Sequence, residues 1–228
     1  MRQFYAARWW RPLLAGAIIL TYCLGCAVNW AREAEYYAHA PRTIVVMPPA
    51  NLTNNLNAVN LCLATLVKPL ILRGYYVFPI ELTAAILKQE GIDEGMAWQI
   101  PPQRLRQYFG ADAVLYPTIH RWDTTYVVLE SHVIVAMSYR LVDTSSGEPI
   151  WENQASKVHQ SSMVLSRNLL ASLVTTAISA AATAAFSDYV ELATQTHREG
   201  FAALPPGYCH PDYARIQHDI EAWRASHK

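Results

Sequence analysis

The spacing of apolar residues changes from one segment of this chain to the next, and each spacing predicts a different element. Residues 43–47 form a continuous, mostly β-branched run that ends at two prolines, which is typical of a strand buried on both faces. Residues 59–73 place apolar side chains at helical spacing, with Gly74 just beyond the helix and Pro69 favouring a kink or an early end. Residues 75–78 form a second short apolar run, so the chain opens as β-α-β.

Further elements follow at short intervals and complete an α+β (mixed α/β) fold. Pro117 lies just beyond the start of one strand, which suggests an edge strand or a bulge there. We expect a mixed sheet with helices packed against it, in which antiparallel hairpins and a long C-terminal helix follow the β-α-β start. The expected helices cover residues 81–90 and 103–109, and the expected strands begin at residue 113, span 126–142 and return at residue 150 after a turn at 144–147.

Residues 169–186 contain no charged side chain, so a membrane-spanning helix has to be considered. Their apolar and hydroxyl-bearing side chains separate onto two helical faces, which a helix surrounded by lipid has no need to do. This separation favours an amphipathic helix laid on the sheet or at a dimer contact. Contact with a membrane surface and a membrane span remain as alternatives.

The N-terminal segment has the pattern of a lipoprotein signal peptide. Arg2, Arg8 and Arg11 precede an apolar run at residues 13–20, which is too short to span a bilayer. Gly25-Cys26 resembles a lipobox, in which the chain is cleaved before the cysteine and that cysteine receives lipid. We therefore expect cleavage between Gly25 and Cys26, lipidation of Cys26 and attachment to a membrane through palmitate-type acyl chains. Secretion without lipid and an uncleaved anchor are the alternatives.

The expected organisation follows from this cleavage site. Residues 1–25 form the signal peptide, 26–41 a lipid-anchored linker, 42–200 the α/β lipoprotein domain and 201–228 a C-terminal tail. The residue after Cys26 is alanine, whereas aspartate at that position retains lipoproteins at the inner membrane in some bacteria. We therefore expect an outer-membrane anchor and a domain that faces the periplasm.

Composition and charge agree with a folded envelope domain. The chain is 52% hydrophobic and 16% charged, which is too apolar for a disordered protein. Removing residues 1–25 removes three of the 18 lysines and arginines and none of the 18 acidic residues, so the mature chain has a formal net charge of −3. Nucleic-acid binding needs a basic face, so we expect no nucleic-acid partner.

The mature chain retains two cysteines besides Cys26. An oxidising periplasm would permit a disulfide between Cys62 and Cys209, whereas the apolar neighbours of Cys62 favour a buried free thiol. The eight histidines form no metal-binding motif, although His120 and His132 could face each other across a hairpin. A metal cluster at residues 209–212 would lack the supporting residues that metal sites need.

The sequence offers little for catalysis. It has no G-x-S-x-G motif and no glycine-rich phosphate loop. Asp143 precedes Ser145-Ser146-Gly147, where a capped turn is a simpler explanation than acid–base chemistry. We expect no enzymatic activity, no cofactor and no metal.

Taken in order, the motifs resemble those of a known family. The family is that of bacterial outer-membrane lipoproteins of unknown function typified by a neisserial vaccine-candidate lipoprotein antigen, and the resemblance covers about residues 26–200. The matching motifs, after the lipobox, are residues 41–49, 74–79, 100–102, 109–116, 141–147 and Trp151.

The resemblance carries expectations for fold and function. It implies a fold similar to the N-terminal α/β domain of TolB and a non-enzymatic role through protein–protein contacts in the envelope, with a homodimer as one possible arrangement. The strand–turn–strand at residues 141–151 is also similar to that of the curli-secretion lipoprotein. The alternative is a subunit of an oligomeric export or secretion complex, in which the helix around residues 169–186 contributes to assembly.

Overall fold

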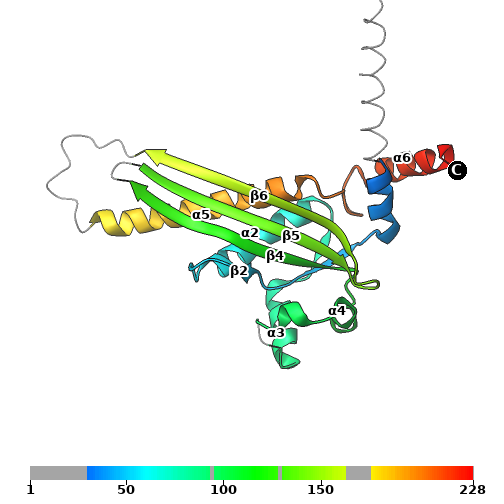
Figure 1. Ribbon diagram of the computed structural model, residues 1–228, viewed down its shortest axis with the longest axis horizontal. Helices are drawn as coiled ribbons and strands as arrows, with labels where there is room; N and C mark the ends of the chain where they lie inside the picture. The colour runs from blue at the N-terminus through cyan, green and yellow to red at the C-terminus, as the bar shows by residue number, and fades with distance from the viewer. Residues whose placement is uncertain (1–29, 93–94, 128–129, 163–175, 228) are drawn as a thin grey trace, which may run out of the picture. The chain divides into compact units, whose positions relative to one another are not determined.

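The computed structural model describes residues 30–92, 95–127, 130–162 and 176–227 (Figure 1). The chain divides into two compact units. One contains residues 41–213 and holds the sheet, and the other combines the helix over residues 30–39 with most of α6 (Tyr213–Ser226). Each unit is described separately.

A six-stranded mixed sheet forms the centre of the larger unit. Its strands are β1 (Thr43–Val46), β2 (Ala50–Asn51), β3 (Tyr76–Val77), β4 (Ala113–Val127), β5 (Glu130–Asp143) and β6 (Pro149–Ser162). The order is β3-β1-β4-β5-β6, and β2 pairs with β4 as a continuation of β1. β1 is parallel to β3 and β4, whereas β4, β5 and β6 are antiparallel, so the predicted fold class is confirmed.

The expectation that Pro117 marks an edge strand is wrong, because β4 lies in the middle of the sheet. β1 pairs with residues up to Leu115, and β2 resumes pairing at Thr118. Pro117 therefore sits where neither parallel neighbour pairs with β4, and its missing N–H leaves no gap in a ladder. The irregularity in β4 lies further on, where the register shifts between Ile119 and Arg121.

Helices cover both faces of the sheet. α3 (Ile80–Gln89), η2 (Ala97–Gln99) and α4 (Pro102–Phe109) pack on one face, where Val45, Met47 and Val114 join a buried apolar cluster. α5 (Thr176–Ala202) packs on the other and contacts α2 (Ala58–Leu72). Figure 1 shows α5 running along β4, β5 and β6, with α4 near the start of β4.

α2 continues past Pro69 and ends at Leu72. Gly74 follows with φ of +89°, a conformation that glycine adopts without strain, and its N–H donates to the Ile71 carbonyl. Gly74 also permits a close approach by the chain near Gly207, because a Cβ there would lie 2.8 Å from the Gly207 carbonyl oxygen. Residues expected in the C-terminal tail thus contact the end of α2.

Residues 169–175 of the uncharged segment at 169–186 lie outside the described part of the chain, and the side chains of the whole segment do as well. The backbone is helical from Thr176, and side chains are described from Tyr189 onward. α5 extends well beyond the expected end at residue 186, and its last turns bury Leu192, His197 and Phe201 against the sheet.

The smaller unit pairs two helices. Arg224 of α6 donates from Nη2 to the Ala34 carbonyl over 2.8 Å, and Tyr36 and Tyr37 contact each other edge to face. The helix over residues 30–39 lies within the expected linker. Among all described helices of the chain, none combines the length and the apolar character that crossing a bilayer requires.

Candidate functional site

An apolar space in the larger unit lies between α2 and α3, at the carboxyl end of β1. It exists because β3 is short. The register of β3 with β1 covers Thr43 and Ile44, and α3 begins soon afterwards at Ile80. Val46 and Pro48 therefore face a space bounded by the two helices, here called the α2–α3 cavity. Its volume is about 410 Å³.

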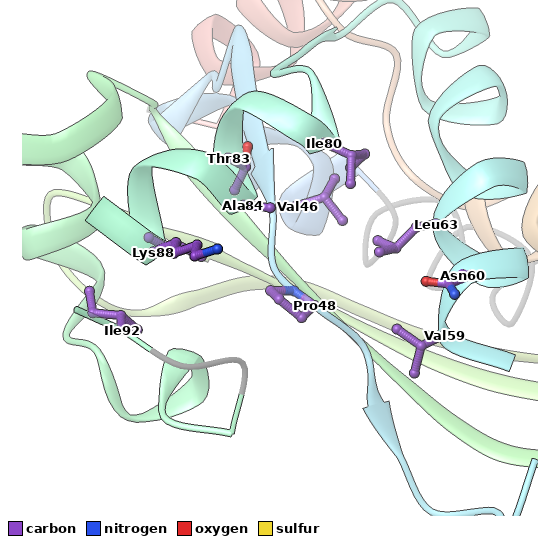
Figure 2. Close-up of a pocket in the computed structure, with 11 residues that line it drawn as sticks. Val46, Pro48, Val59, Asn60, Leu63, Ile80, Thr83, Ala84, Lys88 and Ile92 are labelled. Atoms are coloured by element: carbon purple, nitrogen blue, oxygen red, sulfur yellow. The ribbon is translucent and has the colours of Figure 1, made fainter. Parts of the chain in front are cut away.

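Apolar side chains line the α2–α3 cavity on three sides (Figure 2). Ile80 and Leu63 project into it from opposite helices, with Val46 between them, and Lys88 extends along the α3 side. The apolar lining consists of Val46, Pro48, Val59, Leu63, Ile80, Ala84, Leu87 and Ile92; the polar lining consists of Asn60, Thr83 and Lys88. This lining resembles that of a small-molecule site, where apolar walls surround a few polar groups.

Two further hollows lie in the same unit. One of about 420 Å³ shares Asn60, Leu63 and Ile80 with the α2–α3 cavity and extends along α2 to Val67. The other, of about 530 Å³, is polar and lies on the sheet face beside η2. There Arg140 stacks over the Tyr116 ring, which itself contacts Trp98.

Three of the motifs that carried the family resemblance, at residues 41–49, 109–116 and 141–147, meet at the corner where β1 and β4 begin. Asp112 Oδ2 accepts hydrogen bonds from the N–H groups of Arg42 and Thr43 and from the Thr43 hydroxyl, at 3.0, 3.1 and 3.0 Å. Thr144 is fully buried and donates its hydroxyl to the carbonyls of Ala111 and Asp112. These motif residues therefore hold the sheet together.

Asp143 caps the turn between β5 and β6, as expected. Its Oδ1 accepts from the N–H groups of Ser145 and Ser146 at 2.8 and 2.7 Å, and Gly147 adopts φ of +79°. The Ser146 hydroxyl also donates to the Asp143 carboxylate, so this serine serves the turn.

A buried polar pair lies between β5 and α5. Tyr139 Oη and His197 Nδ1 share a hydrogen bond of 2.8 Å, and His197 Nε2 is buried without a partner among the described residues. Burial lowers the pKa of His197 from 6.5 to about 3, because the imidazolium form would lose its hydration. Burial, and secondarily the nearby Cys62, raises the pKa of Tyr139 well above 10.

Both described cysteines are free. Cys62 is fully buried, and burial raises the pKa of its thiol, whereas Cys209 is exposed. The buried-thiol interpretation of Cys62 thus matches the structure. Cys209 instead donates its backbone N–H to the Gly74 carbonyl over 3.0 Å.

Within the described part of the chain, the histidines form no cluster. His120 bonds to Ser138 over 2.7 Å, and His132 pairs in register with Thr125, so the two do not face each other. His210 Nδ1 accepts from the N–H of Asp212 within one local turn. Among the described residues, no group of three histidine, cysteine or acidic side chains could hold a metal ion.

Gly25 and Cys26, the residues singled out for cleavage and lipidation, lie outside the described part of the chain. The α2–α3 cavity was not predicted from the sequence, because its walls come from three separate elements whose spacing depends on the sheet. The last turns of α5 were not predicted either. Their signal was present, since the buried residues there follow helical spacing, at Tyr189, Leu192, Ala193, Thr196, His197, Gly200 and Phe201.

The larger unit is thus an α+β domain with a mixed sheet and an apolar cavity at its edge. The family model described as "Putative lipoprotein GNA1162-like" matches residues 33–206, and the chain belongs to this family. The expected family resemblance is thereby confirmed.

Two relatives agree with this assignment. The chain is 33% identical over 172 residues to "Putative lipoprotein NMB1124/NMB1162" of Neisseria meningitidis serogroup B, an alignment that covers 74% of this chain and 80% of the relative. It is also similar to the crystal structure of lipoprotein GNA1162 from Neisseria meningitidis, with 34% identity and a TM-score of 0.50. That match covers 63% of this chain and 99% of the other.

Proposed function

We propose that this protein is a lipid-anchored lipoprotein of the bacterial outer membrane that acts, without catalysis, through protein–protein contacts in envelope assembly or transport. Cleavage between Gly25 and Cys26 removes residues 1–25, and acylated Cys26 becomes the anchor. The domain faces the periplasm. One observation carries the proposal: a basic and apolar N-terminus that ends at Gly25-Cys26 occurs in a chain that belongs to a lipoprotein family.

The structure supports this proposal through the position of the larger unit. That unit begins at residue 41, fifteen residues after Cys26, so anchor and domain are separate in the sequence. One acyl chain binds a membrane only marginally, whereas several acyl chains hold it stably. A multiply acylated Cys26 would therefore keep the domain at the bilayer without a spanning helix.

Replacing Cys26 tests the anchor. We expect Cys26→Ala to release the protein from membrane fractions or to block its processing, whereas Cys209→Ala, which removes an exposed thiol, should fractionate like wild type. Mass spectrometry of the mature N-terminal peptide should find acyl groups on Cys26. A Cys26→Ala protein that stays membrane-bound at the wild-type mass would contradict the proposal.

The open edge of the sheet favours a second candidate, a subunit of an oligomeric export or secretion complex. β6 contains 14 residues and, within the described chain, pairs with β5 alone. Long unpaired edge strands are surfaces on which another chain can add a strand. Val158 on this strand is 59% exposed.

Mass measurement separates the two candidates. For an export subunit, light scattering on the full chain in detergent should give masses well above a dimer. Val158→Lys, which places a charge on β6, should lower that mass, and Tyr208→Lys, at an exposed residue outside the strands, should not. If the wild-type protein forms only monomers or dimers, the export-subunit candidate is excluded.

A further inference from the structure

The α2–α3 cavity has features of a ligand site that the proposed anchor does not explain. Its volume of about 410 Å³ lies in the lower part of the range for small-molecule pockets, about 300 to 1,000 Å³. Leu63 and Ile80 are only partly buried, so this apolar surface stays in contact with solvent in the ligand-free chain. A ligand that covers it gains the free energy of removing apolar surface from water.

The polar groups of the cavity indicate the head of such a ligand. The Thr83 hydroxyl donates to the Pro79 carbonyl within its own helix turn, so it is already engaged. Asn60 and Lys88 remain to meet a polar ligand group, from α2 and α3 respectively. Lys88 is the only charged residue among the lining residues, and its amine points toward the cavity in Figure 2.

We propose that the α2–α3 cavity binds a single acyl chain that carries an anionic head group. The chain lies against Val46, Leu63 and Ile80, and the head lies at the mouth beside Lys88. The neighbouring hollow, which shares Leu63 and Ile80, gives a longer chain room to continue along α2 toward Val67. This site does not depend on acylation of Cys26, so each can fail without the other.

Photocrosslinking in membranes tests the site on the full chain. Membranes that contain the protein are incubated with dodecanoate bearing a diazirine, irradiated and digested, and labelled peptides are identified by mass spectrometry. We expect label on α2 and α3 at cavity-lining residues. Each methylene that enters the cavity should strengthen competition by unlabelled fatty acids, by up to about fourfold, until the chain fills the space.

Two matched pairs of variants sharpen the test. Ala84→Leu fills the cavity and should lower labelling at least tenfold, whereas Ala85→Leu, on the same helix but outside the lining, should not. Lys88→Gln should weaken competition by dodecanoate about threefold and leave dodecanol unchanged, and Lys68→Gln on α2 should change neither. Both lysines are exposed, so these variants probe the head group without disturbing the core.

The outcomes decide the proposal. Competition by free dodecanoate and by an anionic lysophospholipid distinguishes the two sources of such a chain, and the stronger competitor identifies the source. The proposal would be overturned if Ala84→Leu and Ala85→Leu were labelled equally. It would also be overturned if dodecanol and dodecanoate competed equally.

Discussion

The two sides of the larger unit differ in how completely side chains fill the space between elements. Between α5 and the sheet, Tyr139 contacts Phe201 with ring centroids 4.6 Å apart, and Gly200 lies directly against the Tyr139 ring. Between α2 and α3, about 410 Å³ of mostly apolar space is open. The first region has no room for an additional methyl group, and the second has room for a chain of them.

The tightly packed α5–sheet region stabilises the fold, whereas the α2–α3 cavity is a candidate binding site. Protein interiors are packed as densely as organic crystals, and unfilled apolar volume reduces stability. The α5–sheet region follows that rule, as do the hydrogen-bonded residues around Asp112. The α2–α3 cavity is open to solvent, and its apolar lining is left for a ligand to cover.

The largest effect is expected at the tightest contact. A Cβ on Gly200 would overlap Tyr139 Cε2 and lie 3.1 Å from Cζ, and Tyr139 is too buried to move aside. Gly200→Ala should therefore lower the free energy of unfolding by about 3 kcal/mol, measured by urea denaturation. Gly95→Ala, where a Cβ meets nothing within 4 Å, is the control. A Gly200→Ala protein as stable as this control would show that the helix and sheet can separate at little cost.

The corner at Asp112 should show the next largest effect. Asp112→Ala removes the acceptor for the Arg42 and Thr43 N–H groups and the Thr43 hydroxyl, so we expect a loss of about 2.5 kcal/mol in denaturant. Asp123→Ala, which removes an exposed carboxylate 3.7 Å from Arg121, should cost less than about 1 kcal/mol. Equal losses in the two variants would show that the corner does not depend on this carboxylate.

Acid should destabilise the fold through His197. Because its pKa is about 3 in the folded protein and near 6.5 in the unfolded chain, the unfolded state takes up the proton first as the pH falls. The stabilisation is complete above pH 6.5 and decreases down to about pH 3, with a loss of about 2 kcal/mol at pH 5. The free energy of unfolding, measured by denaturation at pH 7 and at pH 5, should differ less between the two pH values for His197→Gln than for wild type. Exposed His218→Gln should behave like wild type, and an unchanged difference in His197→Gln would exclude this histidine as the cause.

Local sequence patterns predicted what depends on local chemistry. The β-α-β start, the Gly74 helix end and the Asp143 turn each follow from a few neighbouring residues, and the structure confirms them. The central position of β4 was missed, because Pro117 is tolerated only through the gap between β1 and β2, and that pairing is set by the whole sheet.

The cavity could not be predicted from sequence for a related reason. Leu63 and Ile80 look like ordinary core positions on two helices, and the space between them depends on where β3 ends relative to β1. The contact between Gly207 and the end of α2 could not be predicted either. The Gly207 N–H donates to the Arg73 carbonyl over 2.7 Å, although more than a hundred residues separate the two in the sequence. No local periodicity encodes such a contact.

The smallest effect on stability is expected at the α2–α3 cavity. This effect is the most informative for the comparison between the cavity and the α5–sheet region. Ala84 is exposed on α3, and leucine is a good helix former, so Ala84→Leu should change the free energy of unfolding by about 0.5 kcal/mol or less. The new side chain would enter unfilled apolar space instead of displacing a neighbour, in contrast to the methyl group added at Gly200. Thermal or urea unfolding of Ala84→Leu beside Ala85→Leu measures this directly. A loss of 2 kcal/mol or more would show that the space between α2 and α3 is as tightly filled as the α5–sheet region, and the two regions would then no longer differ.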